Sequence, residues 1–156
     1  MMRSRAALGR HPIHPILVTV PIGAFVCAAV GDVMYTARGL AQWFEFSRLA
    51  IAVGLLAAPL AAIAGLADYF GLSLPRPTRR KATFHLGLNI VALLFYAISL
   101  VLRWNQPPHE GGSWGFAMTL ATLGLAVLGA SGWLGGQLVF EHHVGVVERE
   151  PTAARS

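Results

Sequence analysis

"LAIAVGLLAAPLAAIAGLADYF", residues 49–70, decides the fold of this chain. The stretch is 22 residues long and contains one charged residue, Asp68, near its end. A helix needs about 20 predominantly apolar residues to cross the hydrocarbon core of a bilayer. We therefore interpret residues 49–70 as a membrane-spanning helix.

Three further stretches have a similar length and composition. They cover residues 13–35, 82–104 and 116–140, and the segments between them contain the Gly, Pro or charged residues that end helices. Hydrophobic residues make up 55% of the 156 residues and charged residues only 12%, about half the usual ~25%. A spanning chain satisfies its backbone polar groups within helices. The sequence therefore predicts an all-α integral membrane four-helix bundle, with one membrane domain and a tail at residues 141–156.

The basic residues indicate the orientation of these helices. Nine of the twelve Lys and Arg residues lie in the N-terminal segment, the connection between the second and third stretches, and the C-terminal tail. Because cytoplasmic loops are enriched in Lys and Arg, we expect both termini and this connection to be cytoplasmic. We interpret the first stretch as a retained helix and not a secretory signal, since it is long and contains Pro15 and Pro21. The lipid bilayer is thus the expected partner of most of the chain.

Five of the six histidines lie at the cytoplasmic side in this topology. They stand at the start of the first helix, the start of the third and the end of the fourth, at the depth of a carboxylate and two amides. The residues of this layer are His11, His14, Asp68, His85, Asn89, Gln137, His142 and His143. Only His109 lies in an outer connection. Polar residues at this depth over several helices are the strongest functional signal in the sequence.

The third helix carries one continuous polar face. Its members are separated by steps of four and three residues, which is the spacing of a single helix face. They are His85, Asn89, Ala92, Tyr96, Ser99 and Arg103. His14 and Asp32 stand eighteen residues apart, so they share a face of the first helix at opposite ends. We expect Asp32 to pair with Arg103 or Arg38 near the outer surface, the alternative being solvation of each charge at the interface.

Histidines within a helix bundle support several kinds of chemistry. Two imidazoles can ligate haem iron, and His14, His85 and His142 could instead hold zinc, copper or iron. Neutral imidazoles with a nearby carboxylate could relay protons or bind a quinone carbonyl. The alternative is that the histidines cap helix ends and hydrogen-bond the neighbouring connection and tail. The expected cofactor site comprises His14, His85, His142, His11, Asp68 and Asn89, with haem b favoured over a transition metal or no cofactor.

Four segments resemble the signature segments of a bacterial family of predicted four-helix membrane proteins of unknown function. They are "GRHPIHPILVTVPIG" (residues 9–23), "GLADY" (65–69), "HLGLN" (85–89) and "GWLGGQLVFEHHVGV" (132–146). Members of that family open with a GHPLHP-like motif and close with a GGxLVYxHGVGV-like motif. His143 departs from the closing motif, which more often has Gly there. The resemblance implies a multi-pass protein of the bacterial inner membrane. Some similar proteins carry a Rieske-type iron–sulfur domain after the membrane part, which suggests a redox link.

Other classes of function lack their sequence signatures. The one cysteine, Cys27, is expected to be buried mid-helix, which leaves neither a disulfide nor an iron–sulfur site within this chain. There is no Gly-rich phosphate loop, GxSxG, HExxH or nucleic-acid-binding motif, and no internal repeat of the kind that transport carriers contain.

We therefore expect a protein that is not an enzyme, at most an electron-transfer subunit. The favoured function is a haem- or metal-binding redox accessory that works with a partner protein or a quinone, with a homo-oligomer as a further assembly to consider. The alternative is a cofactor-free structural or transport subunit of a membrane complex.

Overall fold

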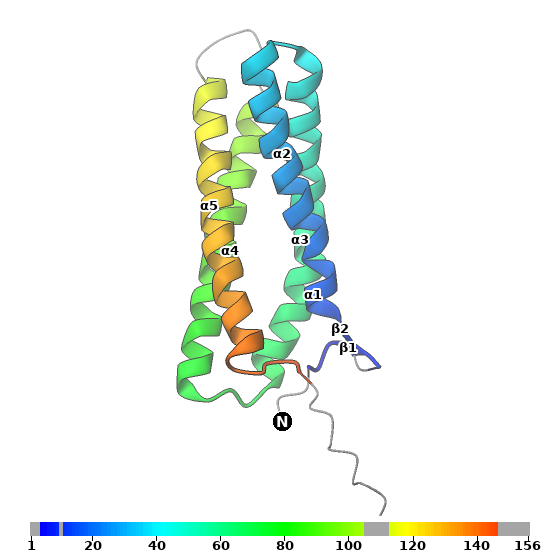
Figure 1. Ribbon diagram of the computed structural model, residues 1–156, viewed down its shortest axis with the longest axis vertical. Helices are drawn as coiled ribbons and strands as arrows, with labels where there is room; N and C mark the ends of the chain where they lie inside the picture. The colour runs from blue at the N-terminus through cyan, green and yellow to red at the C-terminus, as the bar shows by residue number, and fades with distance from the viewer. Residues whose placement is uncertain (1–3, 10, 105–112, 147–156) are drawn as a thin grey trace, which may run out of the picture.

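Helices form most of the chain in the computed structural model, which describes residues 4–9, 11–104 and 113–146. The helices are α1 (Ile13–Leu17), α2 (Thr19–Arg38), α3 (Ala41–Gly71), α4 (Arg76–Trp104) and α5 (Ser113–Phe140). Ahead of α1, the short strand β1 (Ala7–Leu8) pairs antiparallel with β2 (His11–Pro12). α1 continues into α2, so four long rods stand side by side (Figure 1). The predicted all-α four-helix architecture is confirmed.

The helices extend beyond the apolar stretches that predict them. α3 begins at Ala41 and not at residue 49, and α4 begins at Arg76 and not at residue 82. The added turns contain charged side chains, including Glu45 and Arg48, which form an ion pair of 2.5 Å one turn apart on α3. Backbone hydrogen bonding continues past the apolar core because long charged side chains can reach the polar interface.

Proline and glycine explain where the first rod is interrupted and where it ends. Pro21 has no N–H to donate to the carbonyl of Leu17, and the helix is interrupted at Val18. At the other end, Gly39 adopts the left-handed conformation (φ 66°) and donates its N–H to the carbonyl of Tyr35.

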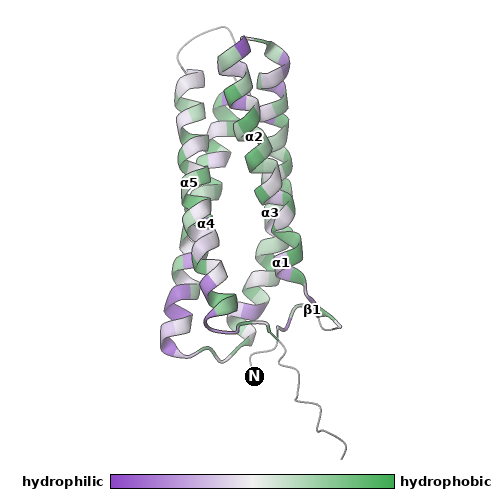
Figure 2. Ribbon diagram, in the orientation of Figure 1, coloured by the Kyte–Doolittle hydropathy of each residue, from purple (hydrophilic) through white to green (hydrophobic). Residues whose placement is uncertain are grey.

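The four rods are long and apolar enough to cross a membrane. The candidate spans are Ile13–Arg38, Ala41–Gly71, Arg76–Trp104 and Ser113–Phe140. Hydrophobic residues run along the middle of the bundle, whereas hydrophilic residues gather toward its ends (Figure 2). Large apolar side chains face outward, among them Leu56 (78% exposed) and Phe140 (81% exposed). A surface of this kind suits a protein that is solvated by lipid. Cys27 is also exposed, so its expected burial is wrong.

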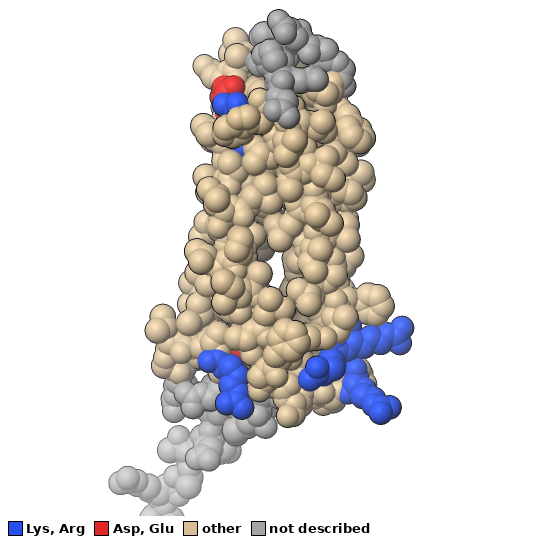
Figure 3. Space-filling model, turned by 180° about the vertical axis from the view of Figure 1, so that it is seen from behind, with Lys and Arg blue, Asp and Glu red and all other residues tan. Residues whose placement is uncertain are grey.

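One end of the bundle carries most of the Lys and Arg side chains that the structure describes (Figure 3). Figure 3 shows Lys and Arg side chains projecting at this end. The N-terminal segment, the connection between α3 and α4, and the residues after α5 all lie there (Figure 1). We call it the basic end. The described residues therefore show the charge asymmetry that the sequence predicts, while Arg3, Arg10, Arg149 and Arg155 lie outside them.

The rods form two hairpins that repeat one arrangement. α2 packs mainly on α3 and α4 mainly on α5, and α2 runs in the same direction as α4 (Figure 1). Buried positions of the first rod recur 71 residues later in α4, and buried positions of α3 recur 70 residues later in α5. The buried pairs are Pro21/Ala92, Phe25/Tyr96, Ala28/Ser99, Asp32/Arg103, Ser47/Ala117, Ile51/Ala121, Gly54/Gly124 and Ala61/Ser131. The expected absence of an internal repeat is wrong, because the burial pattern is kept where side-chain identities have diverged.

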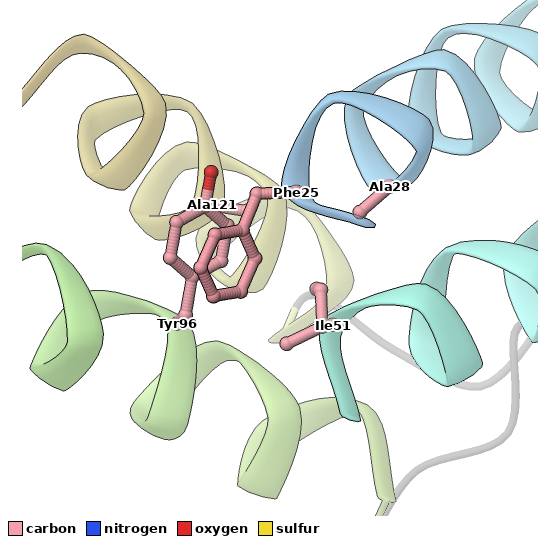
Figure 4. Close-up of a cluster of buried hydrophobic side chains, with 5 residues drawn as sticks. All are labelled: Phe25, Ala28, Ile51, Tyr96 and Ala121. Atoms are coloured by element: carbon pink, nitrogen blue, oxygen red, sulfur yellow. The ribbon is translucent and has the colours of Figure 1, made fainter. Parts of the chain in front are cut away.

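The two hairpins meet in a core at mid-height. Phe25 of α2 and Tyr96 of α4 stack with ring centroids 3.8 Å apart and an interplanar angle of 7° (Figure 4). Each ring also packs against a glycine of its own hairpin: a Cβ added at Gly54 would lie 2.5 Å from Phe25 Cε1, and one added at Gly124 would lie 3.0 Å from Tyr96 Cε2. Because equivalent positions touch each other, an approximate two-fold axis runs between the hairpins along the helices.

Candidate functional site

His14 is held against α3 of its own hairpin. Its Nδ1 lies 2.7 Å from the carbonyl oxygen of Ala61. The ring packs on Gly65, where an added Cβ would lie 3.0 Å from both Cε1 and Nδ1 of the imidazole. Gly65 therefore permits the close approach that brings the ring to the backbone carbonyl.

His85 is held against α5 in the same way. Its Nδ1 lies 2.8 Å from the carbonyl oxygen of Ser131 and 2.9 Å from the Ser131 hydroxyl. Here the ring packs on Gly135, where an added Cβ would lie 3.1 Å from Cε1. Asn89 donates its side-chain amide to the carbonyl of His85 (2.9 Å) and lies 3.1 Å from Nε2 of the ring.

These hydrogen bonds place a proton on Nδ1 of both rings. A backbone carbonyl can only accept a hydrogen bond, so Nδ1 of His14 and Nδ1 of His85 each carry the proton. In the neutral form of each ring, the lone pair is then on Nε2. A histidine that donates Nδ1–H to a carbonyl and keeps Nε2 as a base has the arrangement typical of a metal ligand.

The two histidines occupy equivalent positions across the approximate axis. His85 follows His14 by 71 residues, and the carbonyl and glycine that hold each ring are offset by 70 residues, Ala61 to Ser131 and Gly65 to Gly135. His14 and His85 therefore correspond to each other in the two hairpins, and we call them the histidine pair.

An opening separates the hairpins in the half of the molecule nearer the basic end. The space-filling view shows it passing between the two helix pairs (Figure 3). His14 lies eleven residues before Phe25 on the same helix face, and His85 eleven residues before Tyr96, which places both about 16 Å nearer the basic end than the stacked rings. The histidine pair thus lies in the region of the bundle where the opening separates the hairpins.

Asp68 anchors the N-terminal segment and does not contact the histidine pair through a hydrogen bond that the described residues show. Its carboxylate accepts hydrogen bonds from the Ser4 hydroxyl (2.8 and 2.9 Å), the backbone N–H of Arg5 (2.6 Å) and the N–H of Ala6 (3.3 Å). Ser4 is buried. These hydrogen bonds therefore hold the segment ahead of β1 against α3.

His142 lies in the segment that follows α5, and its contacts differ from those of His14 and His85. Its Nδ1 is 3.2 Å from the hydroxyl of Thr78 on α4. Its Nε2 is buried and has no hydrogen-bond partner among the residues that the structure describes. Three residues on, Gly145 (φ 79°) approaches Pro12 and Ser4. The segment after α5 thus meets the N-terminal segment beneath the bundle (Figure 1).

The remaining histidines are peripheral. His11 in β2 and His143 (φ 52°) are exposed, and His109 lies outside the described residues. Within residues 4–9, 11–104 and 113–146, no three His, Cys, Asp or Glu side chains group closely enough to hold a metal ion. The structure therefore places two of the predicted ligands at equivalent positions of the two hairpins and does not assemble a three-residue metal centre in its described part.

A buried ion pair joins the hairpins at the opposite end. Arg103 donates from its two terminal nitrogens to the carboxylate of Asp32 at 2.5 and 2.7 Å. It also donates to the hydroxyls of Ser47 and Ser99, each at 3.1 Å. Arg103 is 2% exposed and Asp32 4%. Of the partners that the sequence offered, Arg103 and not Arg38 pairs with Asp32, and interfacial solvation of the two charges is excluded.

Sequence reasoning missed the groups that orient the histidines. The acceptors are backbone carbonyls, which have no signature in a sequence, and Ser131 and Thr78 were not singled out. A usable signal was present in the glycines. Gly65 and Gly135 each lie one turn after the accepting carbonyl and share the 70-residue offset.

The fold and the histidine pair together define a multi-pass membrane protein of two repeated helical hairpins. Comparison with known families matches residues 10–148 to a family described as "Predicted membrane protein (DUF2231)". The match covers most of the chain, so the protein belongs to this family of unknown function. No curated protein and no solved structure matches the chain.

Proposed function

We propose that the protein binds one haem b between its two hairpins, with His14 and His85 as the axial ligands. The haem supplies one-electron transfer between its ferric and ferrous states. The protein then acts as an electron-transfer subunit, exchanging electrons with a quinone or a partner protein, and has no catalytic residues of its own. Both termini and the histidine pair face the cytoplasm in this proposal, because the basic end carries most of the Lys and Arg side chains.

One observation carries the proposal. Two imidazoles stand at equivalent positions of two hairpins, each with Nδ1–H bound to a backbone carbonyl of its own hairpin and with Nε2 as the basic nitrogen. A planar cofactor with two axial positions needs one ligand from each side. Bundle interiors are frequent sites for such cofactors, and Figure 3 shows the hairpins parted in this half of the molecule.

The number of ligands favours haem over a bare metal ion. A zinc or copper site needs three or four protein ligands, and no such group exists in the described part of the chain. Haem needs only two, since the porphyrin supplies the other four nitrogens. His142 is therefore not an axial ligand in this proposal, and His11 and Asp68 lie outside the first coordination sphere.

Asn89 keeps the Nε2 of His85 ordered before a ligand is bound. Its amide lies 3.1 Å from that nitrogen and also donates to the His85 carbonyl at 2.9 Å. When Nε2 ligates iron, the second hydrogen bond can keep Asn89 in place. The first hairpin has Val18 at the equivalent position, so the two ligands differ in this contact.

The proposal is tested by expressing the chain in a haem-sufficient host and purifying it in detergent. We expect about one haem per chain and the sharp α and β bands of reduced low-spin haem. His14→Ala and His85→Ala should each lose these bands, whereas His11→Ala and His109→Ala should keep them. Matched elution volumes and helical circular dichroism exclude unfolding as the cause of a loss. A wild-type protein without haem under these conditions refutes the proposal. The alternative function, a cofactor-free structural or transport subunit, would then remain.

A further inference from the structure

The Nε2 atom of His142 is a buried polar atom with no partner in the described part of the chain. The ring is fixed by Thr78, whose hydroxyl lies 3.2 Å from Nδ1 and whose residue is 3% exposed. A buried polar group without a hydrogen bond is costly, so an atom of this kind calls for a partner beyond the residues that the structure describes.

The position of His142 relative to the histidine pair follows from α4. Thr78 precedes His85 by seven residues, which is two turns, so both lie on one face of the helix. Two turns correspond to about 10 Å along the axis. His142 therefore lies on the histidine face, about 10 Å nearer the basic end, where the segment after α5 passes beneath the bundle (Figure 1).

The surroundings of the histidine pair differ in polarity between the side toward the middle of the bundle and the side toward the basic end. Toward the middle of the bundle lies the stacked pair of Phe25 and Tyr96, together with apolar side chains of the core (Figure 4). Toward the basic end lie His142, Thr78 and the projecting Lys and Arg side chains (Figure 3). A haem has one apolar edge and one edge with two propionate carboxylates. Among the described residues, Lys and Arg side chains gather at the basic end (Figure 3) and can attract those carboxylates, whereas the middle of the bundle offers the buried hydroxyl of Tyr96 among apolar side chains.

We infer that His142 binds a propionate carboxylate of the haem through Nε2–H. The inference rests on the proposed haem site and adds the orientation of the cofactor within it. The Thr78 hydroxyl is able to donate to Nδ1 as well as to accept from it, and the inference uses the tautomer in which it donates, so that Nε2 carries the proton. His142 is thus an anchoring residue at the edge of the ring, and the axial ligands remain His14 and His85.

The test compares haem b with haem b dimethyl ester, which has no carboxylates, in titrations of the haem-free protein. Wild type should bind the ester roughly tenfold or more weakly than haem, the effect of losing a charge-assisted hydrogen bond. His142→Ala should bind haem as weakly as the ester and should bind the ester as wild type does. The adjacent exposed histidine is the matched control, and His143→Ala should behave as wild type toward both. The low-spin bands should survive in His142→Ala.

Each remaining result of these titrations would contradict one specific part of the proposal. If wild type binds neither compound, the haem site itself is wrong. If wild type binds both equally, or if His142→Ala weakens both equally, haem binding stands and the propionate contact is refuted. Loss of the low-spin bands in His142→Ala would make His142 an axial ligand and would also refute the inference.

Discussion

Arg103 of α4 and Asp32 of α2 form a buried two-pronged ion pair, although they occupy equivalent positions of the two hairpins. Two equivalent residues can touch only if both lie close to the axis that relates the hairpins. Phe25 and Tyr96 satisfy the same condition. His14 belongs to the face that carries Asp32 and Phe25, which is why the histidine pair also faces the axis.

The ion pair should be the largest polar contribution to the contact between the hairpins. Asp32→Ala leaves the guanidinium of Arg103 buried without its counter-charge, and we expect a loss of about 3–5 kcal/mol in the free energy of unfolding. Chemical denaturation of the detergent-solubilised protein measures this loss. Arg38→Ala is the control, because Arg38 is exposed and should change the unfolding free energy little.

A charge exchange tests the approximate symmetry directly. In the double variant Asp32→Arg with Arg103→Asp, the charges meet again across the axis, so part of the stability lost in each single variant should return. Recovery should be incomplete. The new arginine would face Ala28 and Ala117, where Arg103 has Ser99 and Ser47. If the double variant is as unstable as the sum of the two singles, the positions are not equivalent.

The glycines beside the histidine rings should control cofactor binding. An added Cβ would lie 3.1 Å from His85 Cε1 at Gly135 and 3.0 Å from His14 at Gly65, so Gly135→Ala and Gly65→Ala displace the rings. We expect haem affinity to fall roughly tenfold in each. Gly136→Ala provides the matched control, since a Cβ there meets no atom within 4 Å. Equal affinities in all three variants would contradict the close approach of the rings.

The fold could be predicted from the sequence further than the site. Four apolar stretches of sufficient length predict the four rods, and the eighteen-residue spacing places Asp32 on the face of His14. Hydrophobic length and helical period are properties of the side chains alone. The contacts of His14 with Ala61 and of His85 with Ser131 use backbone oxygens, so the identity of a side chain does not predict them.

The role of Asp68 illustrates the same limit. A carboxylate at the depth of five histidines suggests a partner for imidazole, yet its hydrogen bonds go to Ser4 and to two backbone N–H groups next to it. The segment around Ser4 carries no recognisable motif. Its docking against α3 depends on how the chain returns beneath the bundle, which local sequence patterns do not encode.

Asp68→Ala should release the N-terminal segment and leave the cofactor in place. The N–H groups of Arg5 and Ala6 lose their acceptor, so we expect faster amide hydrogen exchange in a peptide that covers residues 4–9. Haem content should match wild type. Glu141→Ala removes an exposed ion pair with Lys81 and should alter neither quantity. Loss of haem in Asp68→Ala would contradict this role and would indicate that the carboxylate belongs to the cofactor site.

The orientation in the membrane follows from the basic end. Reporter fusions in the connection between α3 and α4 and after residue 146 should both read cytoplasmic, and a fusion in the connection between α4 and α5 should read external. An external reading for the first two fusions would place the histidine pair on the opposite side of the membrane.

Electron paramagnetic resonance of the ferric protein tests the central claim most directly, because it reports how many strong axial ligands the iron has. The account predicts about one low-spin haem per chain in wild type. His14→Ala and His85→Ala should each lose that signal to the same extent, leaving high-spin haem or none, since the two ligands are equivalent across the axis. A wild-type protein without haem, or a low-spin signal that survives in either single variant, would contradict it.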